Sequence, residues 1–219
     1  PTSRLKGGAV TKDGKTLEPL DGHGLQVASI GVLIDPDEPM IWRGPLAVSA
    51  LQQLIKQTNW HDLDYLIVDM PPGTGDIQLS LSQEVPLTGA IVVTTPQDIA
   101  LMDAKKGLVM FEKVNVPILG IIENMATHIC SKCGHEEHIF GEGGAKKMAE
   151  QYGVKLLGEI PLDINIRLSM DKGEPIVEAA PDSKVAQVYK EIARKVGVLV
   201  SERNKDYSAK MPSIKVSND

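Results

Sequence analysis

The sequence is short of aromatic residues, of cysteine and of basic charge, and each shortage limits what the protein can be. Its 219 residues include only two Trp, four Tyr and two Phe, so the core must be built mainly from aliphatic side chains. Two cysteines cannot form the disulfide framework of a small secreted domain, and we expect a cytoplasmic protein with reduced thiols. The formal net charge of -6 argues against nucleic-acid binding through bulk electrostatics. No apolar run approaches the ~20 residues of a membrane span, so we expect no membrane association.

The length fits one large domain with a tail at each end. Residues 1–24 are rich in Gly, Pro, Lys and Thr without a sustained period, and we expect an irregular segment there. Residues 25–200 should form an α/β domain that carries the C-x-x-C at residues 130–133. The polar residues 201–219 should form a frayed tail. The hydrophobic share of 42% is sufficient for a packed core.

Apolar runs alternate with helical periods along the predicted domain. Strands are expected at residues 25–32, 66–69, 90–95, 118–123 and 156–160, with an irregular loop from residue 124 to Phe140. Helices are expected at residues 45–58, 77–85, 100–114 and 143–152 and from about residue 182, where Val185, Val188, Tyr189, Ile192 and Val196 form a buried face. This alternation predicts an α/β fold with a mostly parallel sheet covered by helices on both faces. Ligands of such sheets bind beyond the carboxyl ends of the strands.

The first candidate site follows the predicted strand that ends at Asp69. An apolar run that ends in a carboxylate matches the Walker B pattern, in which the carboxylate orders Mg²⁺ beside a nucleoside triphosphate. Gly73 and Gly75 lie in the turn that follows, where glycine lets backbone amides approach a phosphate. The alternative interpretation is a rigid Pro-Gly turn in which the Asp has only a capping role.

The second candidate site is a C-x-x-C motif formed by Cys130 and Cys133, the only cysteines in the chain. Two thiolates supply half of a tetrahedral metal shell, and three completions are open. His135 and His138 could complete a zinc site, although the single residue between Cys133 and His135 leaves little chain to wrap an ion. The pair could be a thioredoxin-like redox motif, which normally opens a helix directly after a strand. A second copy of the chain could instead supply two more thiolates, and four thiolates suit either an iron–sulfur cluster or zinc.

The third candidate site lies at the ends of two later strands. Asn124 follows the strand predicted at residues 118–123, and Pro161 and Asp163 follow the strand predicted at residues 156–160. An Asn side chain carries an acceptor and two donors, enough to pair with the edge of an adenine. A Pro-Leu segment offers an apolar surface for the ring. The alternative role for Asn124 is turn formation.

A P-loop, which has the pattern G-x-x-x-x-G-K-[ST], does not occur in the sequence. Gly14-Lys15-Thr16 comes close, but the position five residues before Gly14 is Ala9 and no apolar strand leads into it. We therefore expect a solvated Asp-Gly turn there.

Six blocks in this order resemble the Mrp (ApbC-like) iron–sulfur cluster carrier ATPases, relatives of MinD and of the nitrogenase iron protein. The blocks are PMIWRGP at 39–45, DMPPGTGD at 69–76, TPQD at 95–98, ENM at 123–125, CSKCGH at 130–135 and IFG at 139–141. The resemblance extends from about Gly24 to Val196, and the ordered combination is highly specific.

The resemblance implies ATP binding with Mg²⁺, slow ATP hydrolysis, a homodimer, and a [4Fe-4S] cluster that the C-x-x-C motifs of both subunits bridge and pass to apo-proteins. Asp69 matches the Walker B carboxylate, and Asn124 matches the Asn that contacts adenine. The switch II segment is matched by Gly73, Thr74, Gly75 and Asp76. The loop on the base side is matched by Pro161 and Asp163. The cluster ligands are matched by Cys130 and Cys133.

The family's P-loop and its switch I Asp lie upstream of the region that matches Pro1. We therefore expect the chain as given to lack the first strand–P-loop–helix unit, to leave a central sheet edge uncovered and not to hydrolyse ATP alone. A regulatory alternative is an ATP-switched, MinD-like protein with structural zinc at the C-x-x-C. A thiol oxidoreductase is a third, weaker alternative.

Overall fold

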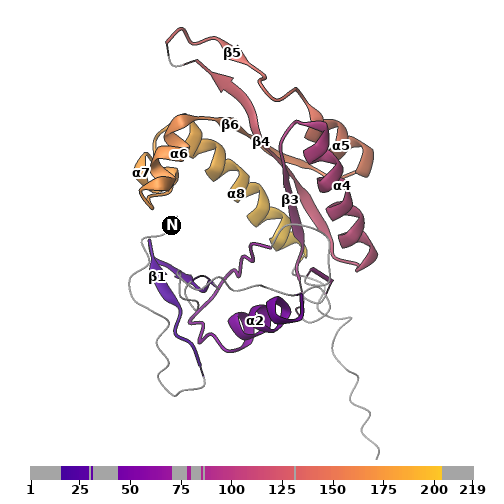
Figure 1. The fold of residues 1–219 in the computed structure, drawn as a ribbon, viewed down its shortest axis with the longest axis vertical. Coiled ribbons are helices and arrows are strands. Elements are labelled where there is room, and N and C mark those ends of the chain that lie inside the picture. Colours follow the sequence, from indigo (N-terminus) through magenta and orange to yellow (C-terminus); the bar gives the residue numbers. More distant parts are fainter. Residues whose placement is uncertain are drawn as a thin grey trace, which may run out of the picture.

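The structure is a computed structural model and describes residues 16–29, 31, 44–70, 78–79, 85, 87–130 and 132–203. A four-stranded sheet lies at its centre (Figure 1). Strands β3 (Ala90–Thr94), β4 (Ile118–Ile129) and β6 (Leu156–Leu162) are parallel, with β4 in the middle. The short strand β5 (Glu136–Glu137) pairs antiparallel with the end of β4. The prediction of a mostly parallel α/β sheet is confirmed.

Helices cover both faces of this sheet, as the alternation of the sequence predicts (Figure 1). On one face, α4 (Asp98–Lys113) and α5 (Gly144–Tyr152) pack against β3 and β4. On the other face, α8 (Lys184–Arg203) packs against β6 and β4. Two shorter helices, α6 (Ile164–Asp171) and α7 (Ile176–Ala179), connect β6 to α8 and were not predicted.

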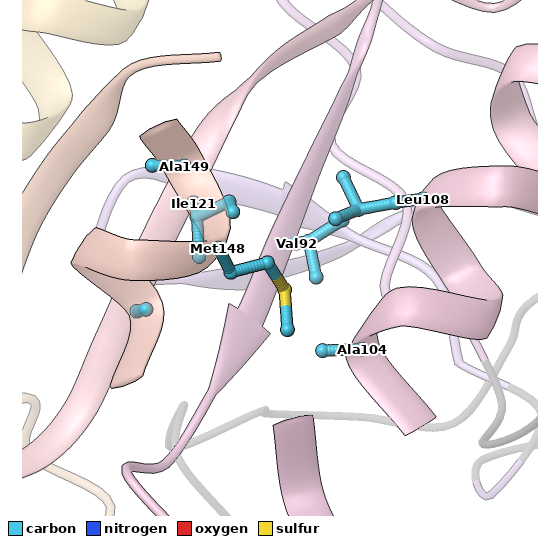
Figure 2. Packing of buried hydrophobic residues seen from close by; sticks show 7 residues of the cluster. Val92, Ala104, Leu108, Ile121, Met148 and Ala149 are labelled. Carbon is cyan, nitrogen blue, oxygen red and sulfur yellow. The ribbon is translucent and has the colours of Figure 1, made fainter. Parts of the chain in front are cut away.

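Each face of the sheet has its own apolar core. Figure 2 shows the first, where Val92 and Ile121 of the sheet face Leu108 of α4 and Met148 of α5. Leu108 and Ile121 are fully buried. The second core, beneath α8, consists of Leu119, Ile122, Leu157, Ile160, Ile192 and Leu199. The predicted inner face of α8 is confirmed at Ile192, and Val188, Tyr189 and Val196 pack around the same core.

Glycine allows two close contacts in the sheet and its helical layers, one between β4 and β6 and one between β6 and α8. A Cβ at Gly120 of β4 would lie 2.5 Å from the Lys155 carbonyl oxygen, which precedes β6. A Cβ at Gly158 of β6 would lie 2.5 Å from Ile192 Cγ1 of α8. The pairing of β4 with β6 and the seating of α8 therefore require these two glycines.

The N-terminal part of the described chain differs from the prediction of a strand at residues 25–32. Strand β2 (Leu25–Val27) is three residues long and pairs antiparallel with β1 (Leu20–Gly22), outside the parallel sheet. His23 and Gly24 form the turn, and both have positive φ (53° and 73°), as a tight two-residue hairpin turn requires. Helix α2 (Gly44–Lys56) follows where a helix was predicted. The His23–Gly24 turn, which the sequence analysis overlooked, makes β2 pair with β1 instead of joining the parallel sheet.

The strand predicted at residues 66–69 is wrong, because residues 65–70 carry no strand in the structure. Ile67 is 90% exposed, and none of the described strands pairs with this run. An apolar run becomes a strand only where a neighbouring strand supplies hydrogen-bond partners. Most of the helix predicted at residues 77–85 lies outside the described residues.

The irregular loop predicted from residue 124 to Phe140 is also wrong. Strand β4 continues to Ile129, six residues beyond its predicted end, and the chain returns through β5 as a hairpin. Figure 1 shows this hairpin projecting beyond the end of the central sheet. The remaining predicted helices and strands, which correspond to α4, α5, α8, β3 and β6, are confirmed within a few residues at their ends.

Candidate functional site

The C-x-x-C motif lies at the tip of the β4–β5 hairpin. Ile129 pairs with Glu136 at the end of the ladder, and the Cys130 amide donates to the His135 carbonyl oxygen at 2.9 Å. The Gly134 amide donates to the Cys130 carbonyl oxygen at 2.8 Å, and Gly134 has a φ of +72°. This left-handed glycine lets the chain turn sharply enough to place both cysteines at one tip. Cys133 is exposed and Cys130 is partly exposed, and neither is in a disulfide.

The turn also activates one of the thiols. The backbone amides of Lys132 and Cys133 and then the Cys133 thiol donate hydrogen bonds that hold the pKa of Cys130 below its ordinary value. Partial desolvation and the negative charge of Glu137 oppose this shift. Hydrogen bonds to a sulfur favour the thiolate, which is the form that binds metal.

Among the residues that the structure describes, the two cysteines find no further metal ligands. Within the described residues, no group of three or more His, Cys, Asp or Glu side chains is placed to hold a metal ion. His138 Nδ1 lies 3.0 Å from the Ala126 carbonyl oxygen, so its ring is bound to β4. The one-chain zinc site with His135 and His138 is therefore not formed. The thioredoxin-like alternative is also disfavoured, because the motif turns a β-hairpin and does not open a helix.

The predicted base-side residues lie together where the regular parallel pairing of β4 with β6 ends. The register pairs Asn124 with Ile160, the residue before Pro161. Asn124 Oδ1 accepts a hydrogen bond from the Met125 amide at 3.0 Å. Pro161 lies within β6, and Asp163 caps α6 by accepting from the Asn165 amide at 2.7 Å. Asp163 therefore has a structural role at the start of α6, while Asn124 and Pro161 occupy the edge where ligands of parallel sheets bind.

The predicted phosphate-side residues are described only in part. Asp69 is exposed and belongs to residues 65–70, which carry no strand. Gly73, Thr74, Gly75 and Asp76 lie outside the described residues. The structure thus brings Asn124, Pro161 and Asp163 to one edge of the sheet and the two cysteines to one turn. It does not describe the geometry of the switch II segment.

Two features at this edge were missed by the sequence analysis. Glu123 is 1% exposed, and its Oε2 accepts a hydrogen bond from the Ala145 amide in the first turn of α5 at 2.6 Å. An open groove of about 600 Å³ lies between α4, α5 and the segment before α5, and its lining mixes apolar side chains with both signs of charge: Lys105, Lys147, Asp98 and Glu142. A Glu at the end of an apolar strand was the available signal for the first feature. Nothing in the sequence pattern indicated the second.

A parallel sheet with polar residues at its strand ends defines an α/β protein of the nucleotide-binding class, and this one carries a hairpin with two free thiols at its tip. Residues 3–197 match the family described as NUBPL iron-transfer P-loop NTPase (ParA). The chain belongs to this family. The resemblance to iron–sulfur cluster carriers, predicted from six sequence blocks, is confirmed.

The relatives agree with this assignment. The iron-sulfur cluster carrier protein of Escherichia coli K12 is 59% identical over 184 residues, which are 84% of this chain and 50% of that protein. The chain thus spans about half the length of the curated relatives that it matches. A solved nucleotide-binding protein from Archaeoglobus fulgidus in complex with ADP is 34% identical, with a TM-score of 0.66 over 81% of this chain and 68% of that one. MinD from Pyrococcus horikoshii, complexed with Mg-ADP, is 26% identical, with a TM-score of 0.52 over 73% of this chain and 58% of that one.

In the part of the chain that the structure describes, no helix combines the length and the apolar character that a membrane crossing requires.

Proposed function

We propose that this chain is the cluster-bearing part of an iron–sulfur cluster carrier that responds to a nucleotide. The observation that carries the proposal is the β4–β5 hairpin, which presents two free thiols at an exposed tip with no further ligands from the described chain. In this proposal the cluster is the cargo of the protein, and the hairpin both binds it and gives it up.

Two copies of the chain are needed to complete the metal shell. A [4Fe-4S] cluster is typically held by four Cys thiolates, and one hairpin supplies two. We therefore propose a homodimer in which Cys130 and Cys133 of both chains bridge one cluster. The lowered pKa of Cys130 supports this role, because a thiolate already favoured by its own turn needs less proton release on binding.

Exposure of the hairpin tip supports transfer of the cluster to acceptor proteins. Thiolates of an apo-protein can reach a cluster held at an exposed turn, whereas a buried cluster would require the fold to open. We propose that apo iron–sulfur proteins are the partners, and that transfer occurs in the cytoplasm, where thiols stay reduced.

The nucleotide that we propose for the edge of the sheet at Asn124 and Pro161 is ATP with Mg²⁺. Asn124 would hydrogen-bond the adenine edge, with Pro161 beside the ring and Asp163 on the same loop. Asp69 and the segment Gly73, Thr74, Gly75 and Asp76 would face the metal and the γ-phosphate. Bound ATP would supply a phosphate whose presence or loss changes the loop that contacts it. The Archaeoglobus fulgidus relative was solved in complex with ADP, which supports nucleotide binding by this fold.

Anaerobic reconstitution with iron and sulfide tests the carrier function. The wild-type chain should become brown, with the broad visible absorption of an iron–sulfur cluster, and Cys130→Ser and Cys133→Ser should stay colourless. His135→Ala is the matched control, because it changes the same turn without removing a sulfur, and it should colour like the wild type. A colourless protein that instead binds one zinc ion per dimer would contradict the proposal and favour the MinD-like regulatory alternative.

A further inference from the structure

A buried carboxylate lies at the base of the thiol hairpin. Glu123 is 1% exposed within β4, and its partner Ala145 is fully buried in the first turn of α5. A buried polar group is costly unless it is hydrogen-bonded, and the N-terminus of a helix offers unpaired amide donors. The 2.6 Å bond between Glu123 Oε2 and the Ala145 amide meets this requirement. The fold therefore keeps a carboxylate inside its core to fasten the start of α5 to β4.

This bond closes the loop that contains both cysteines. Glu123 and Ala145 are 22 residues apart, and the whole β4–β5 hairpin lies between them. Nearer the tip, His138 Nδ1 donates to the Ala126 carbonyl oxygen at 3.0 Å, since a carbonyl can only accept. Two further ties follow, the two-residue β4–β5 ladder and the bond from the Cys130 amide to the His135 carbonyl oxygen.

The regular pairing of β4 with β6 is interrupted beyond Asn124 and resumes only where His128 pairs with Leu162. The register between β4 and β6 shifts between Asn124 and His128, and Met125 in this stretch has a φ of +56°. A non-glycine residue in this region bends the strand and interrupts its pairing. Beyond the shift, β6 holds β4 at His128, whose Nδ1 also lies 3.2 Å from the Leu162 carbonyl oxygen, and the ties to the returning chain add to this hold. Glu123 stands immediately before the shift, and His138 bonds within it.

We infer that Glu123 and His138 are positioning residues that fix the C-x-x-C hairpin relative to the base-side edge of the sheet. This inference rests on the proposed cluster-carrier function, because positioning matters only if the two hairpins of a dimer must meet. Neither residue is among the proposed cluster ligands. Glu123 holds the returning chain where it enters α5, and His138 holds it halfway to the tip, so both limit the directions in which the thiols point.

The test compares four variants. Glu123→Asp retracts the carboxylate by one methylene from the Ala145 amide, and Glu123→Gln keeps an acceptor at the original reach. His138→Ala removes the second tie from a side chain at the surface, so it keeps the inference testable if Glu123→Asp fails to fold. Ser183→Ala is the matched control, because Ser183 Oγ accepts from the Ala186 amide at 3.1 Å and caps α8 on the opposite face of the sheet.

Hydrogen exchange of the metal-free protein gives the first readout. The Cys130 and Gly134 amides should exchange about tenfold faster in Glu123→Asp and in His138→Ala, as expected for the loss of one hydrogen bond to local opening. Glu123→Gln should restore near-wild-type exchange, and Ser183→Ala should affect α8 without a specific change in the hairpin. Hairpin exchange that rises no more in Glu123→Asp and His138→Ala than in Ser183→Ala would overturn the inference.

Release of the cluster to a chelator gives the second readout. Reconstituted Glu123→Asp and His138→Ala should lose visible absorption severalfold faster than the wild type, and Ser183→Ala should release it at the wild-type rate. Equal release rates in all folded variants would overturn the inference while leaving the carrier function intact. A wild-type chain that binds no cluster would contradict the proposed function instead, and the exchange data would still decide whether the two residues order the hairpin.

Discussion

Cys130 is the residue whose chemistry the structure changes most clearly, because amide donors from its own turn lower the pKa of its thiol. Alkylation of Cys130 by iodoacetamide should therefore begin at lower pH in the folded chain than in the same chain unfolded by guanidinium, since the thiolate is the reactive form. Peptide-resolved mass spectrometry across a pH series measures both profiles. Superimposable profiles would contradict the predicted shift.

The sign of the coupled effect on stability follows from the lowered pKa. A thiol whose folded pKa lies below its unfolded pKa stabilises the fold above the unfolded value, and this contribution is lost as pH falls through the folded value. Glu137→Gln is a matched variant, because it removes the charge that opposes the shift. It should move the alkylation profile of Cys130 to still lower pH.

Two glycine-to-alanine substitutions should change stability in opposite directions. Gly153 ends α5 with a φ of +63°, and an added Cβ would meet no atom within 4 Å, so the cost is backbone strain alone. Gly153→Ala should lower the free energy of unfolding by about 1 kcal/mol. Gly107 lies inside α4 with equally open space, and Gly107→Ala should raise stability by roughly 0.5–1 kcal/mol. Urea unfolding of both variants measures the difference, and equal signs would contradict it.

Single residues could be predicted from the sequence where their spacing carried the signal. The C-x-x-C spacing predicts Cys130 and Cys133 as metal ligands and the motif blocks predict Asn124 as a nucleotide contact, and these roles stay predictions. Glu123 was missed as a structural residue because its partner is a backbone amide 22 residues away, which no local pattern reveals. Asp163 was assigned to the base side, yet its carboxylate caps α6, a role that the preceding strand and the following helix period could have suggested.

At the level of helices and strands, the face of α4 that covers the sheet should dominate the stability of this part of the molecule. Leu108 is fully buried between β3, β4 and α5, whereas Met102 on the same helix is 58% exposed. Leu108→Ala should lower the free energy of unfolding by roughly 2–5 kcal/mol through lost burial and a residual cavity. Met102→Ala, the matched control, should change it by no more than about 0.5 kcal/mol. Comparable losses in the two variants, measured by urea unfolding, would contradict the assigned core.

Elements with a strong period and a local partner could be predicted from the sequence, and the others could not. Apolar spacing predicts the elements that pack an apolar face against a neighbouring helix or strand. These elements are α4, α5, α8, β3 and β6. Residues 66–69 have the composition of a strand, but pairing depends on a neighbour that composition does not specify. The β4–β5 hairpin was mistaken for an irregular loop because β5 consists of two Glu residues and its ladder with β4 is only two residues long.

At the scale of the whole molecule, the sheet and its two helical layers place the base-side edge and the thiol hairpin on one strand. Asn124 and Cys130 both belong to the path of β4 and its direct continuation, six residues apart. The layer arrangement could be predicted from the alternation of strands and helices. The distance along β4 between the base-side edge and the thiol hairpin could not be predicted, because it depends on β4 continuing beyond its apolar portion.

Native mass spectrometry of the anaerobically reconstituted chain tests the central claim most directly, because it counts chains and metal together. The expected species contains two chains and about four iron atoms, in line with one cluster held by four thiolates. Iron removal by a chelator should convert it to single chains, and Cys133→Ser should never form it. A single chain that carries metal on its own, or a two-chain species that persists without iron and without Cys133, would contradict a cluster shared between two hairpins.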